Sequence, residues 1–546
     1  MSKNIRNLSA RKGLDDNLFE QLPTDGGPDD QNYRELAGKF LIGNASTYGT
    51  ASFYDFLNPE NSGKKGFYCA GSACLLAGTQ DAVQRDLEAE FGAEAVGPVY
   101  CLGRCYENRA FHIDGKNHSG AEADAISGIC RHEKESRSAG YTIKNHGRGM
   151  LTENALGLDE CLRLLPVWLS RGADTLLEEL KTSGLRGRGG AGFPMAIKLD
   201  TVRKEQASQK YIVCNADEGD PGAFSDRYIL EEQPQLLMAG MALAGYIAGA
   251  TEGVVYIRAE YPESIVIANR VAEQFNNLFP LDTREGRPFS FRLKVIKAQG
   301  AYICGEETAL LNSIEGNRPE VRTRPPFPAQ YGLYGKPTAV NNVETLANLP
   351  FIAQEGGEAF KAVGTAKSSG TKLLSLDSHF QRPGLYEVDM GTPLSFAVYE
   401  LGGGFKEPVK ALHIGGPLGG LVPMSRVNDL SIDFESFSGN GFLLGHASVL
   451  SVPERFPLIK YIEHLFAFTA HESCGKCFPC RIGSVRGKEL FQKAYTSDYR
   501  IDRELLNDLL DTLEKGSLCA LGGGIPLPVK NALQYFEPEL KPYFKN

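Results

Sequence analysis

The chain of 546 residues lacks several features that mark whole classes of protein. It has no run of 18 or more apolar residues, so no membrane span is expected. No dense Lys/Arg block is present, and the net charge of −9 gives no sign of nucleic-acid binding. The basic start, MSKNIRNLSARKGLDDN, lacks the apolar segment of a secretory signal. We therefore expect a cytoplasmic protein.

Disulfides are also not expected, because a reducing compartment favours metal ligation as the role of the 12 cysteines. Eight of them fall into two groups of four. The other four fit positions in the core or in a linker: Cys130, Cys161, Cys214 and Cys304.

The order of predicted elements indicates an α/β protein of several domains, since the chain is too long for one ordinary core. Residues 66–115 have a strand–loop–helix–strand–loop–strand pattern. Apolar strands (KYIVCNAD, GVVYIRAEY) and a buried helix (QPQLLMAGMALAGYIAGA) alternate between about 155 and 345. Short strands with Gly/Pro turns follow, and helices return after 440.

The first cysteine group consists of two short-range pairs, Cys69-x4-Cys74 and Cys101-x3-Cys105, each in a loop after a predicted strand. Four thiolates from two loops can surround a [2Fe–2S] cluster. Zinc is the alternative, although its sites favour C-x2-C spacing. Four free core thiols are the non-functional interpretation.

The second group is the motif ESCGKCFPC, which places Cys474, Cys477 and Cys480 at every third position. This spacing favours a [4Fe–4S] cluster, with zinc again as the alternative. Cys519 in GSLCALGGG is the one cysteine downstream of the motif, and we expect it to be the fourth ligand.

Four loops of the 155–345 region have polar or glycine-rich compositions typical of ligand binding. In GLRGRGGAGFP (184–194), repeated glycines let backbone N–H groups approach a phosphate before a predicted helix. A flexible linker is the other interpretation of this loop. Acids and amides, which can bind hydroxyl groups, occupy NADEGDPGAF, AYICGEETALL and KPTAVNNVET. Each of these three could instead be a capped helix start.

Together, these motifs and ESCGKCFPCR…SLCALGG resemble the NADH-binding flavoprotein subunit of respiratory complex I. They equally resemble the diaphorase subunits of soluble NAD-dependent formate dehydrogenases and hydrogenases. The resemblance covers about 150–546, and residues 66–120 are similar to a thioredoxin-like [2Fe–2S] ferredoxin module. Its fusion ahead of the flavoprotein favours the soluble formate dehydrogenase or hydrogenase branch.

The resemblance implies six regions along the chain. They are an N-terminal extension (1–65), a thioredoxin-like [2Fe–2S] domain (66–120), a linker (121–154), a Rossmann-like FMN/NADH domain (155–350), a ubiquitin-like β-grasp domain (351–438) and a helical bundle holding the [4Fe–4S] cluster (439–546).

The resemblance also implies roles for individual residues. FMN is expected against Gly187, Arg188, Gly189, Gly190, Gly192, Lys198, Asn215, Asp217, Glu218, Gly305, Glu306, Asn341 and Asn342. Glu307 faces the nicotinamide as the catalytic residue, Asp220 binds the NADH ribose, and Phe193 and Phe327 stack on the adenine. The remaining cofactor contacts are Tyr302, Leu521 and Arg324, the last in place of a Lys of other members. An acid near the ribose would repel a 2′-phosphate, which favours NADH over NADPH.

The implied reaction is reversible hydride transfer between NAD(H) and FMN, with single electrons passing through the two clusters to or from a partner subunit. The partners are the iron–sulfur subunits of a formate dehydrogenase or hydrogenase. Complex I and an electron-bifurcating complex are alternatives. The chain ends soon after Cys519, without the extra ferredoxin domain of many bifurcating relatives. A non-catalytic scaffold would have lost the flavin ligands, and these are present.

Overall fold

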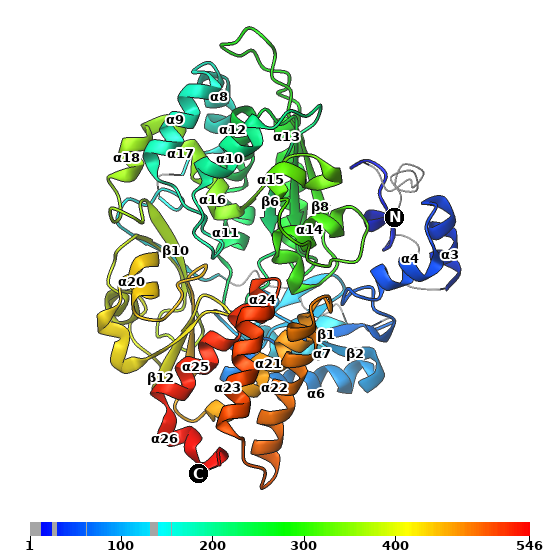
Figure 1. Cartoon of the computed structure of the whole chain (residues 1–546), viewed down its shortest axis with the longest axis vertical. Helices are drawn as coiled ribbons and strands as arrows, with labels where there is room; N and C mark the ends of the chain where they lie inside the picture. Colours follow the sequence, from blue (N-terminus) through cyan, green and yellow to red (C-terminus); the bar gives the residue numbers. More distant parts are fainter. Residues whose placement is uncertain (1–12, 24–29, 62, 132–139, 154, 546) are drawn as a thin grey trace.

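The computed structural model describes residues 13–23, 30–61, 63–131, 140–153 and 155–545 (Figure 1). Residues 1–12, for which the sequence predicts no secretory signal, lie outside the described residues. Other parts of the predicted N-terminal extension and of the predicted linker also lie outside them. Among the described residues, no helix is both long enough and apolar enough to cross a membrane.

A parallel sheet in the order β8-β7-β6-β9 forms the centre of the predicted FMN/NADH region. Its strands are β6 Tyr211–Ala216, β7 Glu252–Ile257, β8 Arg292–Lys297 and β9 Thr338–Asn342. The predicted strands KYIVCNAD and GVVYIRAEY are thereby confirmed as β6 and β7. Helices around the sheet are α8 Leu158–Leu169, α9 Ala173–Ser183, α10 Met195–Lys204, α11 Ser225–Glu232, α12 Pro234–Ala248, α13 Pro262–Asn276, α14 Glu307–Ile314, α15 Pro328–Tyr331, α16 Val343–Ala347, α17 Leu349–Glu355 and α18 Gly357–Lys361.

Two different layers cover the faces of this sheet, because successive side chains of a strand point to opposite faces. Ile212 and Cys214 of β6 pack in one core with α12, all of whose residues are buried. Tyr211 and Val213 pack in a second core with residues of the N-terminal extension such as Phe19. The extension is thus a structural cover of the sheet. It carries α2 Leu18–Gln21, α3 Asp30–Lys39 and α4 Asn44–Ala51.

The first cysteine group belongs to a separate small sheet in the order β2-β1-β3-β4, in which β1 and β2 are parallel. The strand–loop–helix pattern predicted for 66–115 is confirmed. The elements are β1 Gly66–Cys69, α5 Ser72–Ala77, α6 Gln80–Phe91, β2 Val96–Val99, β3 Phe111–Ile113, β4 Lys116–His118 and α7 Ile126–Cys130.

The six-stranded sheet β13-β12-β14-β10-β11-β5 extends beyond the predicted 351–438 domain on both sides. Strand β5 Thr142–His146 comes from the predicted linker and pairs with β11, while β14 Ser448–Pro453 comes from the predicted bundle and pairs with β10. The polar β5 lies at the sheet edge, where a strand needs no apolar alternation. The other strands are β10 Thr371–Leu376, β11 Gly384–Asp389, β12 Val409–Ile414 and β13 Gly420–Pro423, with α19 Leu394–Phe396 and α20 Phe434–Gly439 beside them.

The C-terminal helices form a bundle between the six-stranded sheet and the N-terminal α/β unit, drawn in orange and red in Figure 1. They are α21 Leu458–Glu472, α22 Phe478–Thr496, α23 Arg503–Gly516, α24 Ala520–Gly524, α25 Pro526–Tyr535 and α26 Glu537–Leu540. Three cysteines of the second group lie at the α21–α22 connection, and the fourth immediately precedes α24. A Cβ on Gly522 of α24 would lie 2.7 Å from Cβ of Cys480, so the start of α22 lies against α24.

Gly240 allows the buried helix α12 to approach α16 closely, since a Cβ at this position would overlap the backbone oxygen of Leu346. We expect Gly240→Ala to lower the free energy of unfolding by about 1–3 kcal/mol, because the backbone must shift to relieve the overlap. Urea denaturation followed by circular dichroism measures the change. The control is Gly38→Ala in α3, where a Cβ meets nothing within 4 Å and a gain of about 0.5–1 kcal/mol is expected. Equal stability of the two variants would contradict the packing argument.

Candidate functional site

A cavity of about 750 Å³ opens at the carboxyl ends of β6 and β9, a volume suited to a nucleotide cofactor. The lining includes these residues predicted from the sequence: Gly187, Gly189, Gly192, Phe193, Lys198, Asn215, Glu307, Arg324, Phe327, Asn341 and Asn342. Eight further residues line the cavity without a role predicted from the sequence: Ala191, Thr201, Pro328, Ala329, Gln330, Thr338, Val340 and Thr345. Thr338 and Val340 belong to the motif that contains Asn342, so the period-2 alternation of a strand could have identified them.

The glycine loop closes on itself as a hairpin, in which Gly187 N–H donates to the Phe193 carbonyl at 2.9 Å. Gly190 has a φ of 128°, which disfavours any residue with a side chain. A Cβ on Gly189 would lie 2.9 Å from Cβ of Asn342, so the loop lies directly against the end of β9. Helix α10 begins right after the loop, and its N-terminus favours an anion.

Two cations of the cavity share one carboxylate. Arg324 Nη1 donates to Glu307 Oε1 at 2.9 Å, and Lys198 Nζ lies 3.6 Å from Glu307 Oε2. Lys198 also donates to the Val340 carbonyl at 2.7 Å. Burial lowers the pKa of Lys198, while the Glu307 charge opposes this shift. Arg324 also lies 3.6 Å from Glu306, so two carboxylates balance the two cations, whose N–H groups can still donate to a phosphate.

Three asparagines line the polar side of the cavity. Asn215 Nδ2 donates to the Gly305 carbonyl at 2.8 Å, and Asn342 Nδ2 donates to Asp226 Oδ2 at 2.6 Å. Asn341 is only 7% exposed, and its Nδ2 has no partner within the described part of the chain. A buried amide without a partner is costly, so Asn341 is a donor suited to a bound polar molecule. With the glycine loop, this donor set fits a flavin mononucleotide.

Nine predicted cofactor residues are not part of the cavity lining: Arg188, Gly190, Asp217, Glu218, Asp220, Tyr302, Gly305, Glu306 and Leu521. Arg188 is buried behind the glycine loop, where its Nη2 donates to the Ser369 carbonyl at 2.5 Å. Asp217 is half-buried, and desolvation raises the pKa of its carboxyl group.

Two of these nine residues hold helix ends, the alternative that the sequence had left open. Both carboxylate oxygens of Glu218 accept bonds at the start of α11, from the N–H groups of Asp226 and Arg227 at 2.9 and 3.0 Å. Glu306 caps α14 by accepting from the Thr308 and Ala309 N–H groups, each at 2.9 Å. The protein thereby uses both oxygens of Glu218, whereas the bonds to Glu306 go to Oε2 alone and its Oε1 lies 3.6 Å from Arg324 Nη2.

Asp220 lies apart from the cavity lining, between Tyr302 and His446. The Tyr302 hydroxyl donates to Asp220 Oδ1 at 2.7 Å, and His446 Nε2 lies 2.6 Å from Oδ2. Burial raises the pKa of Asp220, but the His446 charge and these contacts lower it overall. The ribose contact expected for Asp220 stays a prediction, and its ion pair joins the loop after β6 to the segment before β14.

The four cysteines of the first group are buried together, with Cys101 Sγ and Cys105 Sγ 3.6 Å apart. The Cys74 thiol donates a hydrogen bond to Cys69, and backbone N–H groups of the two loops donate to it as well. These bonds lower the pKa of Cys69 to about 6. The pKa of Cys101 is lowered in the same way by Cys105, and each donor thiol has a raised pKa. Four sulfurs that share one buried site and face backbone N–H groups fit a tetrathiolate centre.

The cysteines of the second group also converge. Cys474 and Cys480 are buried, and Cys477 and Cys519 pack beside them at the starts of α22 and α24. Burial raises the pKa of Cys519 to about 12, and the charges of Glu306, Cys480 and Cys474 add to the shift. Cys519 is thus close to the other thiols and to Glu306, while Leu521 is buried next to it. The sequence prediction that Cys519 completes the set fits this geometry.

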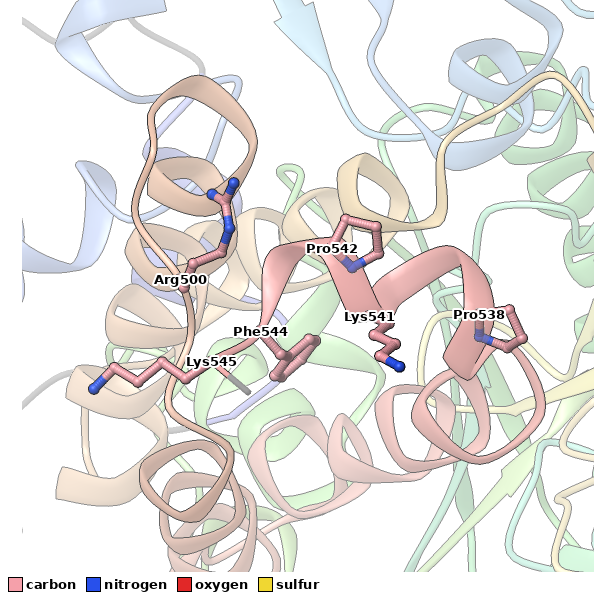
Figure 2. A pocket seen from close by; sticks show the side chains of 6 residues that line it. All are labelled: Arg500, Pro538, Lys541, Pro542, Phe544 and Lys545. Carbon is pink, nitrogen blue, oxygen red and sulfur yellow. The ribbon is translucent and has the colours of Figure 1, made fainter.

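Another hollow, of about 580 Å³, lies at the C-terminal end of the bundle (Figure 2). It is lined by Arg500, Pro538, Lys541, Pro542, Phe544 and Lys545. None of the predicted site residues belongs to it.

Comparisons with known proteins decide the family. The model described as the Nuo51 FMN-binding domain matches residues 180–351, and that described as the NADH-ubiquinone oxidoreductase-F iron-sulfur binding region matches 460–543. The NAD-reducing hydrogenase HoxS subunit alpha of Cupriavidus necator is 32% identical over 580 residues, covering 98% of this chain and 92% of that protein. The chain belongs to the family that contains the F subunits of NADH-quinone oxidoreductases and the alpha subunits of NAD-reducing hydrogenases.

Other members of this family match a shorter part of the chain. The F 2 subunit of the NADH-quinone oxidoreductase of Rhizobium meliloti is 40% identical over 67% of this chain and 88% of its own length. The NADP-reducing hydrogenase subunit HndC of Solidesulfovibrio fructosivorans is 41% identical over 67% of this chain and 75% of its own. A crystal structure of the NAD⁺-reducing [NiFe]-hydrogenase in the air-oxidised state matches 98% of this chain and 95% of that one, with a TM-score of 0.85 and 29% identity. The predicted family, the FMN-binding and [4Fe–4S] regions and the class of FMN-dependent NADH oxidoreductase are confirmed.

The Asp220–His446 pair predicts a pH dependence of stability. Although burial lowers the pKa of His446, the Asp220 charge raises it overall, above 6.5. A raised histidine pKa gives stability that is complete below about pH 6.5 and is lost as pH rises through the folded value. We expect His446→Asn to remove this loss between pH 6 and 9 in urea denaturation. The control is His146→Asn at an exposed position of β5, which should keep the wild-type slope. The same slope in His446→Asn would contradict the assignment.

Proposed function

We propose that this chain is the NADH:acceptor diaphorase subunit of a multi-subunit redox complex. The observation that carries the proposal is the cavity between the glycine loop and β9, which presents the cations Lys198 and Arg324 together with the Asn341 amide, unpartnered among the described residues. This arrangement suits a phosphate and a flavin ring edge together. The full-length match to the HoxS alpha subunit supports the same function.

Within the cavity, backbone N–H groups of 187–192, the start of α10 and Lys198 hold the FMN phosphate. Asn215, Asn341 and Asn342 orient the ribityl chain and the ring. Bound FMN supplies the conversion between the two-electron chemistry of NADH and single-electron transfer. No side chain needs to act as an acid or base, because the hydride carries its own proton and electrons.

The nicotinamide nucleotide enters beside Glu307, and its adenine stacks between Phe193 and Phe327. These rings are 50% and 52% exposed, as expected for side chains that await a flat ligand. A preference for NADH over NADPH does not follow from Asp220, which lies outside the lining. We base it on the full-length relative, whose name specifies NAD.

The four thiolates of the second group hold a [4Fe–4S] cluster, and those of the first group a [2Fe–2S] cluster on a thioredoxin-like domain. Arg324 lines the cavity and lies 3.6 Å from Glu306, whose charge in turn acts on Cys519. The second group therefore lies near the cavity, as electron transfer between them requires. We also propose that residues 351–438 form a ubiquitin-like β-grasp domain. The proposed location of the protein is the cytoplasm.

An apolar stripe on α22 supports docking of a partner subunit. Phe478, Ile482 and Val485 are exposed at helical spacing, Phe478 to 66%, beside the ligand Cys477. Exposed apolar side chains grouped on one face mark protein interfaces. We propose an iron–sulfur subunit of a soluble hydrogenase as the partner, in preference to a formate dehydrogenase, complex I or a bifurcating complex, because the HoxS alpha subunit matches along the whole chain. A scaffold without catalysis remains the rival from another class.

The first test is an anaerobic titration of the purified chain with NADH, followed by visible absorbance and low-temperature EPR. We expect flavin bleaching and the signals of two reduced clusters. Cys519→Ser should abolish one signal and lower bound iron, since a cubane cluster needs its fourth thiolate. Cys130→Ser, outside both groups, should leave spectra and iron unchanged. Bound iron and FMN without any bleaching would favour the scaffold.

Partner docking is tested with Phe478→Asp, which places a charge on the stripe. We expect the tagged variant to lose its partner subunits in size-exclusion chromatography with light scattering, while its own flavin and iron content stays normal. Val266→Asp on α13 is the matched control, because Val266 is similarly exposed but far along the chain from the cysteines. An intact complex in Phe478→Asp would contradict this docking surface.

A further inference from the structure

The loop that carries Cys101 and Cys105 is held by residues of the FMN-binding domain. Gly222 N–H donates to Cys105 Sγ at 3.2 Å, and Arg227 Nη1 donates to the Gly103 carbonyl at 2.7 Å. A Cβ at Gly103 would overlap the ring of Tyr261. The loop is therefore shaped against a surface that lies far away from it in the sequence.

Arg258, which directly follows β7, lies at the centre of this surface. It is 3% exposed, and its Nη2 donates to the Tyr100 carbonyl at 3.1 Å, beside Cys101. Its Nη1 donates to the Glu218 carbonyl at 2.7 Å, in the loop after β6. One guanidinium thus joins the cysteine loop to the acidic loop of the flavoprotein domain.

Glu260 and Tyr261 fix the position of the guanidinium. Arg258 Nη2 lies 2.7 Å from Glu260 Oε1, and its Cζ is 5.1 Å from the centre of the Tyr261 ring. Burial works against the charge of Arg258, but Glu260, Tyr261 and Cys101 together raise its pKa well above the ordinary value. After the Cys105 bond, the Arg258 charge also contributes to the lowered pKa of Cys101. Arg258 is therefore a permanent buried cation close to a cluster ligand.

We propose that Arg258 is a positioning residue that fastens the Cys101–Cys105 loop to the flavoprotein domain and makes the N-terminal cluster easier to reduce. The inference rests on the proposed function, which assigns a [2Fe–2S] cluster to these thiolates. One-electron reduction adds one negative charge to the bound cluster, with the electron supplied by NADH through the flavin. A nearby cation in a buried site stabilises that added charge and raises the reduction potential.

The test is an EPR-monitored redox titration of the full-length chain with mediators, which does not depend on NADH turnover. We expect Arg258→Gln to shift the one-electron equilibrium of the N-terminal cluster at least tenfold toward the oxidised form, about 59 mV lower in potential. The potential of the other cluster and the FMN content should not change. Arg258→Lys keeps the charge and should give a smaller shift. The double variant Arg258→Gln/Glu260→Gln removes both charges of the ion pair. The reduction potential of its N-terminal cluster should lie between the potentials of that cluster in wild type and in Arg258→Gln.

Arg171→Gln is the matched control, because Arg171 pairs with Glu179 at 3.1 Å away from both cysteine groups. An unchanged potential in Arg258→Gln, or an equal shift of both clusters, overturns this inference alone. Loss of the N-terminal cluster in Arg258→Gln, with retention in Arg258→Lys and Arg171→Gln, supports the fastening role. Loss in all three variants overturns it. A wild-type chain without a second cluster signal overturns the cluster assignment itself, and the inference with it.

Discussion

The carboxyl ends of the parallel strands β6, β7 and β9 meet at one edge of a single sheet, and the candidate site depends on this constraint. The segment after β6 supplies Glu218, Asp220 and Gly222, the segment after β7 supplies Arg258, and the end of β9 supplies the two adjacent asparagines. Parallel strands hold these segments in a fixed order, because register and direction are set by the buried strand residues. A shift of one strand would displace the cavity and the surface beneath the Cys101 loop together.

Local motifs made part of the site predictable. The glycine loop and the strands β6 and β7 follow from local composition, and most of the loop's predicted glycines line the cavity. Within each cysteine group, the short-range pairs and the triplet follow from spacing, whereas Cys519 joins its group only through the return of the chain at α24. Glu218 and Glu306 were less predictable, because a carboxylate between a strand and a helix can bind a ligand or cap the helix. Only the tertiary structure shows which N–H groups are within reach, and it assigns both side chains to helix ends.

Long-range pairing explains what the sequence did not reveal. The N-terminal extension has no motif of its own, yet Phe19 and Tyr54 pack against the face of the parallel sheet opposite α12. Strand β5 joins a sheet whose other strands are far away in the sequence, between β10 and β14. Such a polar strand carries little periodic signal, and its partner determines its structure more than its own composition does.

The fusion of the N-terminal unit to the flavoprotein has a physical consequence for the Cys101–Cys105 loop. Two loop carbonyls and the sulfur of Cys105 accept bonds from Arg258, Arg227 and Gly222, so residues of the flavoprotein domain hold the loop. In two separate chains these bonds would form only after association, at the cost of translational and rotational freedom. In one chain the second surface is present at a high effective concentration. A single polypeptide therefore keeps the loop in this shape without a second chain, and the cation at Arg258 becomes a permanent part of the environment of its cysteines.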